Sequence, residues 1–414
     1  MKRTSCRILT ATFTVVLFFG AVCDRLFALS SGQASIYTLD GRCVQASPLS
    51  VDRKGLLRLQ GDSDHDAIPF ERVHMIAFRA AAAEPMAEGA VGVLFQKGDY
   101  LTGIVTGGDA EKIVLDNPLL GLLDIPIDAI QMLLPGAGDI PADFGRYALS
   151  EEEDVIYRRR KSGFGEDFIE GTVDLFSEKG LTFECSLGLV DFTFGQLNAV
   201  VIGSAGAESG AECDTFVLLK GGAGRVTGSF EKFENGRLSM AGSFLPQVSL
   251  PVDVIESISF RRESMRFVSD LEPARVDQSP YIGAAADFLF PFQRDRSVSG
   301  RGLVCGGQRF AKGLGVHSRA RLSWDLGDSF TSFQAFVGIS DETGDLRARG
   351  SIRFRVQVDG RTQFESPILR GGDGVVQLPI IPLDGAKTLT LEADFADGFD
   401  SGDRGLWGQA FLLK

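Results

Sequence analysis

The residues best suited to chemistry lie near the C-terminal end of the sequence. Four aspartates, Asp394, Asp397, Asp400 and Asp403, recur every three residues, and Gly398 and the glycine before Asp403 let the chain curl. Carboxylate oxygens that converge on one point are the ligands that Ca²⁺ prefers. We therefore consider a structural Ca²⁺ ion bound by these four residues. A solvated acidic loop without an ion is the alternative, because the strict calcium-loop motif is absent.

A second group of candidates follows this loop directly. Trp407 offers a ring for the apolar face of a sugar, while Asp400, Asp403 and Gln409 offer hydrogen-bonding partners for its hydroxyls. Side chains two positions apart in a strand project to the same face, so Trp407 and Gln409 could meet one ligand. The sequence thus predicts a carbohydrate site here. Phe411 shares that face, so a row of core residues is the alternative.

His317 closes a glycine-rich stretch, residues 312–318. In the functional interpretation, His317 and Ser318 line the sugar-binding end or support a strand beneath it. In the structural interpretation, His317 is a core histidine hydrogen-bonded to the backbone. The chain has only three histidines and no Cys-x-x-Cys pair, so a zinc site or a Ser-His-Asp triad has little support.

These candidates need a framework of strands to position them. Alternating apolar residues at 333–341, 351–360 and 385–391 predict half-buried strands. Asp359 and Gly360 predict a two-residue hairpin turn, since glycine tolerates a positive φ. A further glycine-rich stretch, residues 221–224, is followed by a strand pattern and predicts a hairpin turn rather than a phosphate-binding loop.

In order and spacing, these segments and the stretch 312–318 resemble the NPCBM family of carbohydrate-binding modules over residues 279–414. The resemblance implies a jelly-roll β-sandwich of the galactose-binding-like kind, with sugar bound by loops at one end. It also implies an aspartate-rich element that ends in a tryptophan, which Asp403 and Trp407 match. Modules of this kind often carry a structural Ca²⁺. The resemblance does not name the sugar.

Upstream of that segment the sequence repeats itself. Related motifs contain Ile68, Ile125, Phe192 and Leu250 at equivalent positions, at intervals of about 57 to 67 residues. Each follows strand-like patterns and weakly resembles part of an Sm-like small β-barrel. We expect four such barrels, at residues 33–78, 90–135, 166–203 and 212–262. Between the second and third, residues 136–165 form a charged linker in which opposite charges at 151–161 favour a solvated helix.

The N-terminus has the pattern of an export signal. A basic start precedes an apolar run, residues 11–22, that is too short for an ordinary transmembrane helix. We predict a signal peptide at residues 1–30 and a secreted, periplasmic or cell-envelope location. Lipid attachment at Cys23 and retention of the segment as an anchor are alternatives. No later stretch predicts a membrane span.

Charge and composition narrow the function. The formal net charge of −13 disfavours nucleic acid as a partner. The sequence therefore predicts an all-β protein, with tandem small barrels before a C-terminal sandwich, that binds a glycan or polysaccharide without catalysis. A structural or scaffolding protein whose repeats contact other proteins is one alternative, with its protein partner unknown. A carbohydrate-active hydrolase is another, although no carboxylate pair stands out.

Overall fold

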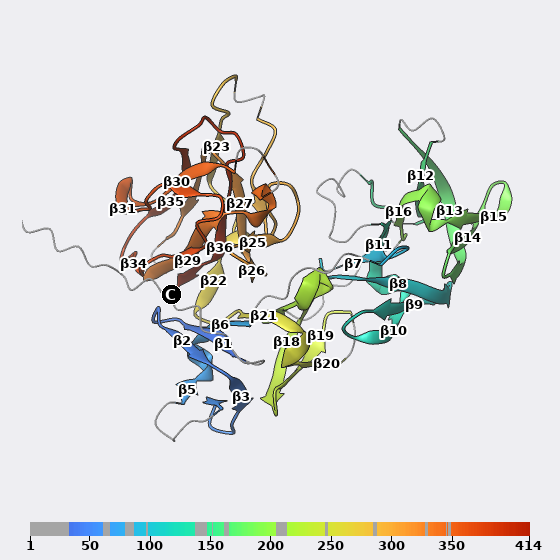
Figure 1. Cartoon of the computed structure of the whole chain (residues 1–414), viewed down its shortest axis with the longest axis horizontal. Helices are drawn as coiled ribbons and strands as arrows, with labels where there is room; N and C mark the ends of the chain where they lie inside the picture. Colours follow the sequence, from blue (N-terminus) through green and yellow to red (C-terminus); the bar gives the residue numbers. More distant parts are fainter. Residues whose placement is uncertain are drawn as a thin grey trace, which may run out of the picture.

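The computed structural model describes residues 33–60, 67–78, 87–96, 98–136, 147–150, 152–160, 165–203, 213–244, 247–284, 288–327, 330–344, 346 and 349–414. The predicted signal peptide, residues 1–30, lies outside these residues. Within the described ranges the regular structure consists of β-strands and short 3₁₀ turns, without an α-helix (Figure 1). The predicted all-β class is confirmed. No helix in these ranges is long and apolar enough to cross a membrane.

The C-terminal part is a sandwich of two antiparallel sheets. The first sheet contains, in spatial order, β24 (Gln293–Arg294), β27 (Gly313–His317), β36 (Arg404–Leu413), β29 (Ser332–Ile339) and β33 (Val376–Gln377), with β22 (Met265–Phe267) beside β36 and β34 (Ile381–Pro382) beside β29. The second contains β23 (Arg275–Gln278), β28 (Ala320–Asp325), β35 (Thr388–Phe395), β30 (Ser351–Val358) and β31 (Arg361–Glu365), with β32 (Leu369–Arg370) beside β30.

Large apolar side chains from both sheets fill the space between them. Trp407 of β36 and Phe354 of β30 are both fully buried. Their rings meet edge to face at 5.3 Å and 89°, a favoured arrangement for aromatic pairs. The predicted Asp359–Gly360 turn is confirmed, because Val358 pairs with Arg361 and both central residues have a positive φ.

The N-terminal part contains four units with the same strand pairing. In each unit the first strand pairs with both the second and the last, and the middle strands form a meander. Unit 1 has β1 (Ala34–Thr38), β2 (Cys43–Ala46), β3 (Pro48–Val51), β4 (Leu56–Leu59), β5 (Ile68–Pro69) and β6 (Val73–Phe78). Unit 2 has β7 (Val91–Phe95), β8 (Tyr100–Asp109), β9 (Lys112–Asn117), β10 (Gly121–Pro126) and β11 (Ile130–Pro135). Unit 3 has β12 (Asp154–Arg159), β13 (Glu166–Ser177), β14 (Gly180–Cys185), β15 (Gly188–Thr193) and β16 (Leu197–Val201). Unit 4 has β17 (Thr215–Leu219), β18 (Gly224–Glu234), β19 (Arg237–Gly242), β20 (Val248–Pro251) and β21 (Ile255–Phe260).

The repeated sequence motif occupies the same place in every unit. It spans the end of a strand, one 3₁₀ turn and the start of the last strand; the turns are η1 (Phe70–Arg72), η2 (Ile127–Ala129), η4 (Phe194–Gln196) and η6 (Val252–Val254). Ile68, Ile125, Phe192 and Leu250 are all buried. The repeat is therefore a structural unit, and its closure into a small barrel stays a prediction. The predicted turn at residues 221–224 lies between β17 and β18, where the structure has η5 (Lys220–Gly222).

The helix predicted at residues 151–161 is wrong. Asp154–Arg159 is strand β12, which pairs with β13 and β16, so unit 3 begins inside the predicted linker, residues 136–165. The opposite charges pair across strands instead of along a helix: Arg158 and Arg160 lie 3.2 and 2.7 Å from the carboxylate of Asp167. Cross-strand charge pairs stabilise a sheet as i,i+4 pairs stabilise a helix.

The units also pair with one another through their last strands. β6 of unit 1 pairs with β21 of unit 4, and β11 of unit 2 pairs with β16 of unit 3. β8 and β18 join the two pairs of units. The sandwich packs on unit 1, with Tyr37 and Met75 against Phe336 and Leu406, and on unit 4, with Phe216 against Phe411. Figure 1 shows units 2 and 3 on the side of the repeat region away from the sandwich.

Candidate functional site

An exposed group of aromatic rings lies on the loops at one end of the sandwich. Tyr281 and Phe399 are 49% and 60% exposed, and Phe395 lies beside them. The ring of Tyr281 meets Phe395 and Phe399 edge to face, each at 5.1 Å. We call these three residues the aromatic loop cluster. Exposed rings that are held in place can accept the apolar face of a ligand.

The loop after β35 holds this cluster in position. The backbone N–H of Tyr281 donates to Asp400 Oδ2 at 2.8 Å, which ties two loops together. Phe399 has a φ of 69°, a backbone conformation that is uncommon for a residue with a side chain. Fixed backbone of this kind is frequent at binding sites.

A charged pair lies at the loop after β35, with Asp397 on the loop and Arg370 at the end of β32. Arg370 pairs with Asp397, and both side chains are more than half exposed. The backbone N–H of Asp397 donates to Ser351 Oγ at 2.8 Å, which fixes the loop to β30. A guanidinium and a carboxylate can exchange hydrogen bonds with hydroxyl groups, so the loop end presents both apolar and polar recognition elements.

His317 is a core histidine hydrogen-bonded to the backbone, as the structural interpretation predicted. Its side chain is buried, and Nδ1 donates to the carbonyl oxygen of Ser318 at 2.9 Å. The imidazole stacks on Phe290, with ring centres 4.8 Å apart and planes 17° apart. Burial lowers the pKa of His317, which keeps the ring neutral. His317 therefore lies beneath the loop end and offers a ligand almost no surface.

Asp403 is also buried. Its carboxylate accepts hydrogen bonds from the hydroxyl of Ser318 and, at 2.6 Å, from the backbone N–H of Ser351. Burial raises the pKa of Asp403 to about 6, although these hydrogen bonds oppose the shift. Asp403 thus joins the beginnings of β30 and β36 to the end of β27. Contrary to expectation, it is not accessible to a sugar.

Trp407 and Gln409 are fully buried and face opposite sides of β36. Trp407 lies in the sandwich core, so it has no exposed face on which a sugar could stack. Gln409 accepts a hydrogen bond from Ser259 Oγ at 2.8 Å and donates to the carbonyl oxygen of His74 at 3.0 Å. Both partners belong to the repeat units. Gln409 therefore binds the repeats to the sandwich and does not contribute to a sugar site.

A β-bulge explains why the side chains of Trp407 and Gln409 point to opposite faces of β36. The register of β36 against β29 shifts by one residue at this point, and Gln409 has a φ of 47°. An extra residue in a strand reverses the alternation of faces beyond it. Trp407 accordingly points into the sandwich, whereas Gln409 and Phe411 contact residues outside it.

The four aspartates of the proposed calcium site do not converge. Asp394 pairs with Arg355 at 2.7 Å and Asp397 with Arg370. Asp400 accepts from the backbone of Tyr281, and Asp403 is enclosed by Ser318 and Ser351. Throughout the described residues, no group of three or more His, Cys, Asp or Glu side chains could hold a metal ion. The donor set does not fit Ca²⁺, and the acidic loop is ordered by arginines and backbone N–H groups.

Comparison with known proteins places this segment in a family. The family model of the NPCBM/NEW2 domain matches residues 266–413. The C-terminal sandwich is an NPCBM/NEW2 domain. The match begins in β22, ahead of the resemblance at residues 279–414, and ends in β36.

A curated relative and two solved structures show similarity. "Putative endo-alpha-N-acetylgalactosaminidase" of Renibacterium salmoninarum is 27% identical over 171 residues; the match covers 39% of this chain and 11% of the relative. The chain thus spans only a small part of that protein. The CBM51 of a Clostridium perfringens GH95 protein, solved with methyl-galactose, is 25% identical, with coverage of 36% of this chain and 99% of that one and a TM-score of 0.31. Tandem CBM51 modules of a family 98 glycoside hydrolase from Streptococcus pneumoniae are 11% identical, covering 92% and 87%, with a TM-score of 0.31.

Sequence reasoning missed the aromatic loop cluster of the NPCBM/NEW2 domain. Phe399 lies between Gly398 and Asp400, inside the loop that contains the four aspartates. An aromatic residue flanked by glycine and aspartate is out of place in a solvated acidic loop, and that was the available signal. Tyr281 and Arg370 carried no such signal, because only the folded chain brings them to this loop.

Proposed function

We propose that the chain is a non-catalytic carbohydrate-binding protein of the cell envelope or the extracellular space. Its NPCBM/NEW2 domain binds a glycan at the aromatic loop cluster. The observation that carries this proposal is the pair of exposed rings, Tyr281 and Phe399, held in place at the loop end of a domain from a family named for carbohydrate binding.

The loop end has both kinds of contact that a sugar requires. The apolar C–H face of a pyranose packs on an aromatic plane, and the ring hydroxyls need hydrogen-bonding partners. Arg370 and Asp397 form an exposed pair at the loop after β35 and can exchange such bonds. Asp400 keeps one carboxylate oxygen engaged with the backbone of Tyr281, so its role is to position the ring.

The carboxylates of this loop end support a binding role without catalysis. Glycoside hydrolysis canonically requires two carboxyl groups flanking the bond, one of which has a raised pKa and reaches the substrate. Asp403 has a raised pKa, but its side chain is buried against Ser318 and Ser351 and does not reach a ligand at the surface. The other three loop aspartates are held by arginines or backbone N–H groups.

Binding of the full-length chain to a glycan array, followed by titration of the best glycan, tests the proposal. Phe399→Ala and Tyr281→Ala should each weaken binding by about 1–3 kcal/mol, by analogy with other stacking on aromatic side chains. Phe168→Ala is the matched control, because Phe168 on β13 is similarly exposed but belongs to unit 3. Unchanged binding in both loop variants would reject the site.

The export part of the proposal rests on the N-terminal sequence. A basic start and an apolar run at residues 11–22 have the pattern of a signal peptide. N-terminal sequencing of the protein from its producing cells should find a mature chain that begins near residue 30. A chain that begins at a lipid-modified Cys23 would show that the protein is a lipoprotein. An intact N-terminus in the membrane fraction would show that the segment is kept as an anchor.

A scaffolding role is the second candidate, because unit 3 exposes large apolar side chains. Leu187 is 86% exposed and Leu189 is 64% exposed on the turn and strand after β14. Exposed apolar side chains that gather in one region are typical of protein contacts. A chain that binds no glycan on the array but binds an envelope protein through unit 3 would favour this role.

A further inference from the structure

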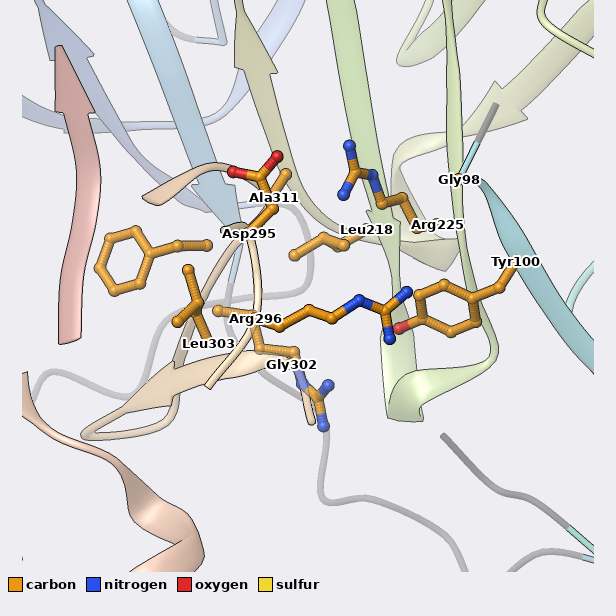
Figure 2. Close-up of a pocket in the computed structure, with 11 residues that line it drawn as sticks. Gly98, Tyr100, Leu218, Arg225, Asp295, Arg296, Gly302, Leu303 and Ala311 are labelled. Carbon is orange, nitrogen blue, oxygen red and sulfur yellow. The ribbon is translucent and has the colours of Figure 1, made fainter. Parts of the chain in front are cut away.

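A cavity that shares no residue with the aromatic loop cluster lies where three parts of the chain meet. Tyr100 comes from unit 2, Arg225 from unit 4, and Arg296, Arg309 and Asp295 from the NPCBM/NEW2 domain. The space measures about 420 Å³, including the part open to solvent. Figure 2 shows Tyr100 and Arg225 on one side of it and Asp295, Leu303 and Ala311 on the other.

The guanidinium groups of Arg225, Arg296 and Arg309 line this cavity. Asp295 is the acidic residue of the lining, and its carboxylate is shared among the Lys312 ammonium, the backbone N–H of Gly313 and the attraction of Arg225. The buried carboxyl of Asp99 also faces Arg225, but it accepts hydrogen bonds from Thr227 and Ser243. Nε of Arg225 is buried and has no hydrogen-bond partner among the described residues. A buried donor without a partner costs free energy unless a ligand or water satisfies it.

The third arginine has a weak counterion. Arg309 Nε lies 3.3 Å from Glu256 Oε1, yet neither carboxylate oxygen of Glu256 makes a hydrogen bond in the described part of the structure. Burial raises the pKa of Glu256 to about 7, and the charge of Arg309 opposes this only in part. Burial therefore favours the neutral form of Glu256, so this carboxyl balances the charge of Arg309 only in part.

We propose that this cavity binds an oxyanion group of a small ligand: a sulfate, a phosphate or a carboxylate. Guanidinium groups present forked donors that match the oxygens of such groups, and the hydroxyl of Tyr100 adds one more donor. This site is separate from the aromatic loop cluster and does not depend on the proposed glycan binding. Because its walls come from units 2 and 4 and from the NPCBM/NEW2 domain, a bound anion links the repeats to the sandwich.

Isothermal titration of the full-length chain tests the proposal with three separate probes: inorganic sulfate, inorganic phosphate and glucuronate. Ionic strength is held constant with sodium chloride, so that general screening cancels. Saturable binding of at least one probe is expected. Selective binding of sulfate or phosphate identifies a tetrahedral anion, and selective binding of glucuronate identifies an acidic sugar. Absence of saturable binding for all three overturns the proposal.

Variants locate the binding. Arg225→Gln should weaken it by about tenfold or more, the effect of losing a hydrogen bond to a charged group. Arg361→Gln is the matched control, since Arg361 is exposed on the β30–β31 hairpin and remote from the cavity lining. Tyr100→Phe keeps the shape of the wall and should also weaken binding, which gives a second measurement if Arg225→Gln does not fold. Equal affinity of Tyr100→Phe and Arg361→Gln would overturn the assignment.

Discussion

The sandwich and the repeat units use buried carboxylates for different purposes. In the NPCBM/NEW2 domain, Asp403 gathers the hydroxyl of Ser318 and the backbone of Ser351, and so shapes the loops of a single domain. In the repeats, Asp99 of unit 2 accepts hydrogen bonds from Thr227 N and Oγ1 of unit 4, at 2.9 and 3.0 Å, and from the Ser243 hydroxyl. One carboxylate orders the loops of a single domain, and the other joins two units.

The apolar cores of the two regions also differ: the repeat units share one core, and the sandwich has its own. The four units share one continuous apolar cluster, which includes Ile36, Leu115, Phe183 and Leu250. The sandwich has a cluster of its own, centred on Trp407. A change at the exposed aromatic loop cluster should therefore leave the repeats undisturbed, whereas a change in the shared core of one repeat unit should affect its neighbours. The following predictions test this contrast, beginning with the largest effect.

Truncation of the sandwich core should have the greatest effect. Trp407→Ala removes a fully buried ring that meets Phe354 edge to face, so we expect a loss of about 3–5 kcal/mol in the free energy of unfolding. Chemical denaturation of the wild-type chain and the variant measures this difference in the free energy of unfolding. Phe399→Ala, at the exposed loop end, should change stability by no more than about 0.5 kcal/mol. Similar values for the two variants would contradict the placement of Trp407.

The interface carboxyl Glu256 should make stability depend on pH. Its pKa is raised from 4.5 to about 7, so between these values the folded chain binds more protons than the unfolded chain. Stability contributed by Glu256 is therefore complete below about pH 4.5 and lost as the pH rises through 7, by up to about 3 kcal/mol. Asp403, with a pKa raised to about 6, makes stability depend on pH in the same direction over a lower pH range. The pH profile of the wild-type protein must therefore be compared with that of Glu256→Gln. Identical pH profiles of the two proteins would refute the role of Glu256.

The link between units 2 and 4 should be weaker than a core ring but measurable. Asp99→Ala leaves buried donors of Thr227 without their acceptor, which should cost about 1–3 kcal/mol in unfolding free energy. Asp191→Ala removes an exposed carboxylate from β15 and provides the control. If both variants unfold at the same denaturant concentration, the buried carboxylate does not fasten the units.

Calcium should have the smallest effect. The loop aspartates have separate partners, so millimolar Ca²⁺ or a chelator should leave the melting temperature of the full-length chain unchanged. A rise with Ca²⁺ that disappears in Asp397→Asn would show that the loop rearranges around an ion and would restore the calcium interpretation.

Local patterns predicted the elements of this fold better than its site. Alternating apolar residues and the Asp359–Gly360 pair specify strands and a turn through neighbours in sequence, and the structure has them there. The bulge at Gln409 depends on contacts with His74 and Ser259, which lie far away in the chain. No local pattern announces it, and one inserted residue is enough to turn a predicted binding face into two buried ones.

The same limit applies to the charged segments. Asp394 and Asp397 looked like ligands for one ion because the arginines that engage them, Arg355 and Arg370, come from other strands. Arg158 and Arg160 looked helical because their partner Asp167 lies across a strand pair. Charge patterns give the composition of a surface, but only long-range pairing decides which charges meet.

The pairing of last strands has a consequence for synthesis of the chain. Units 2 and 3, which pair through β11 and β16, are neighbours in sequence, so these two strands can pair soon after they leave the ribosome. The second neighbour of β6 in unit 1 is made much later, because Ala77 of β6 pairs with Ser257 of β21, about 180 residues further along the chain. For that interval β6 presents an open sheet edge to every other nascent chain nearby. Because units 2 and 3 lie between the two strands that pair, unit 1 is the part of the chain most exposed to aggregation during synthesis.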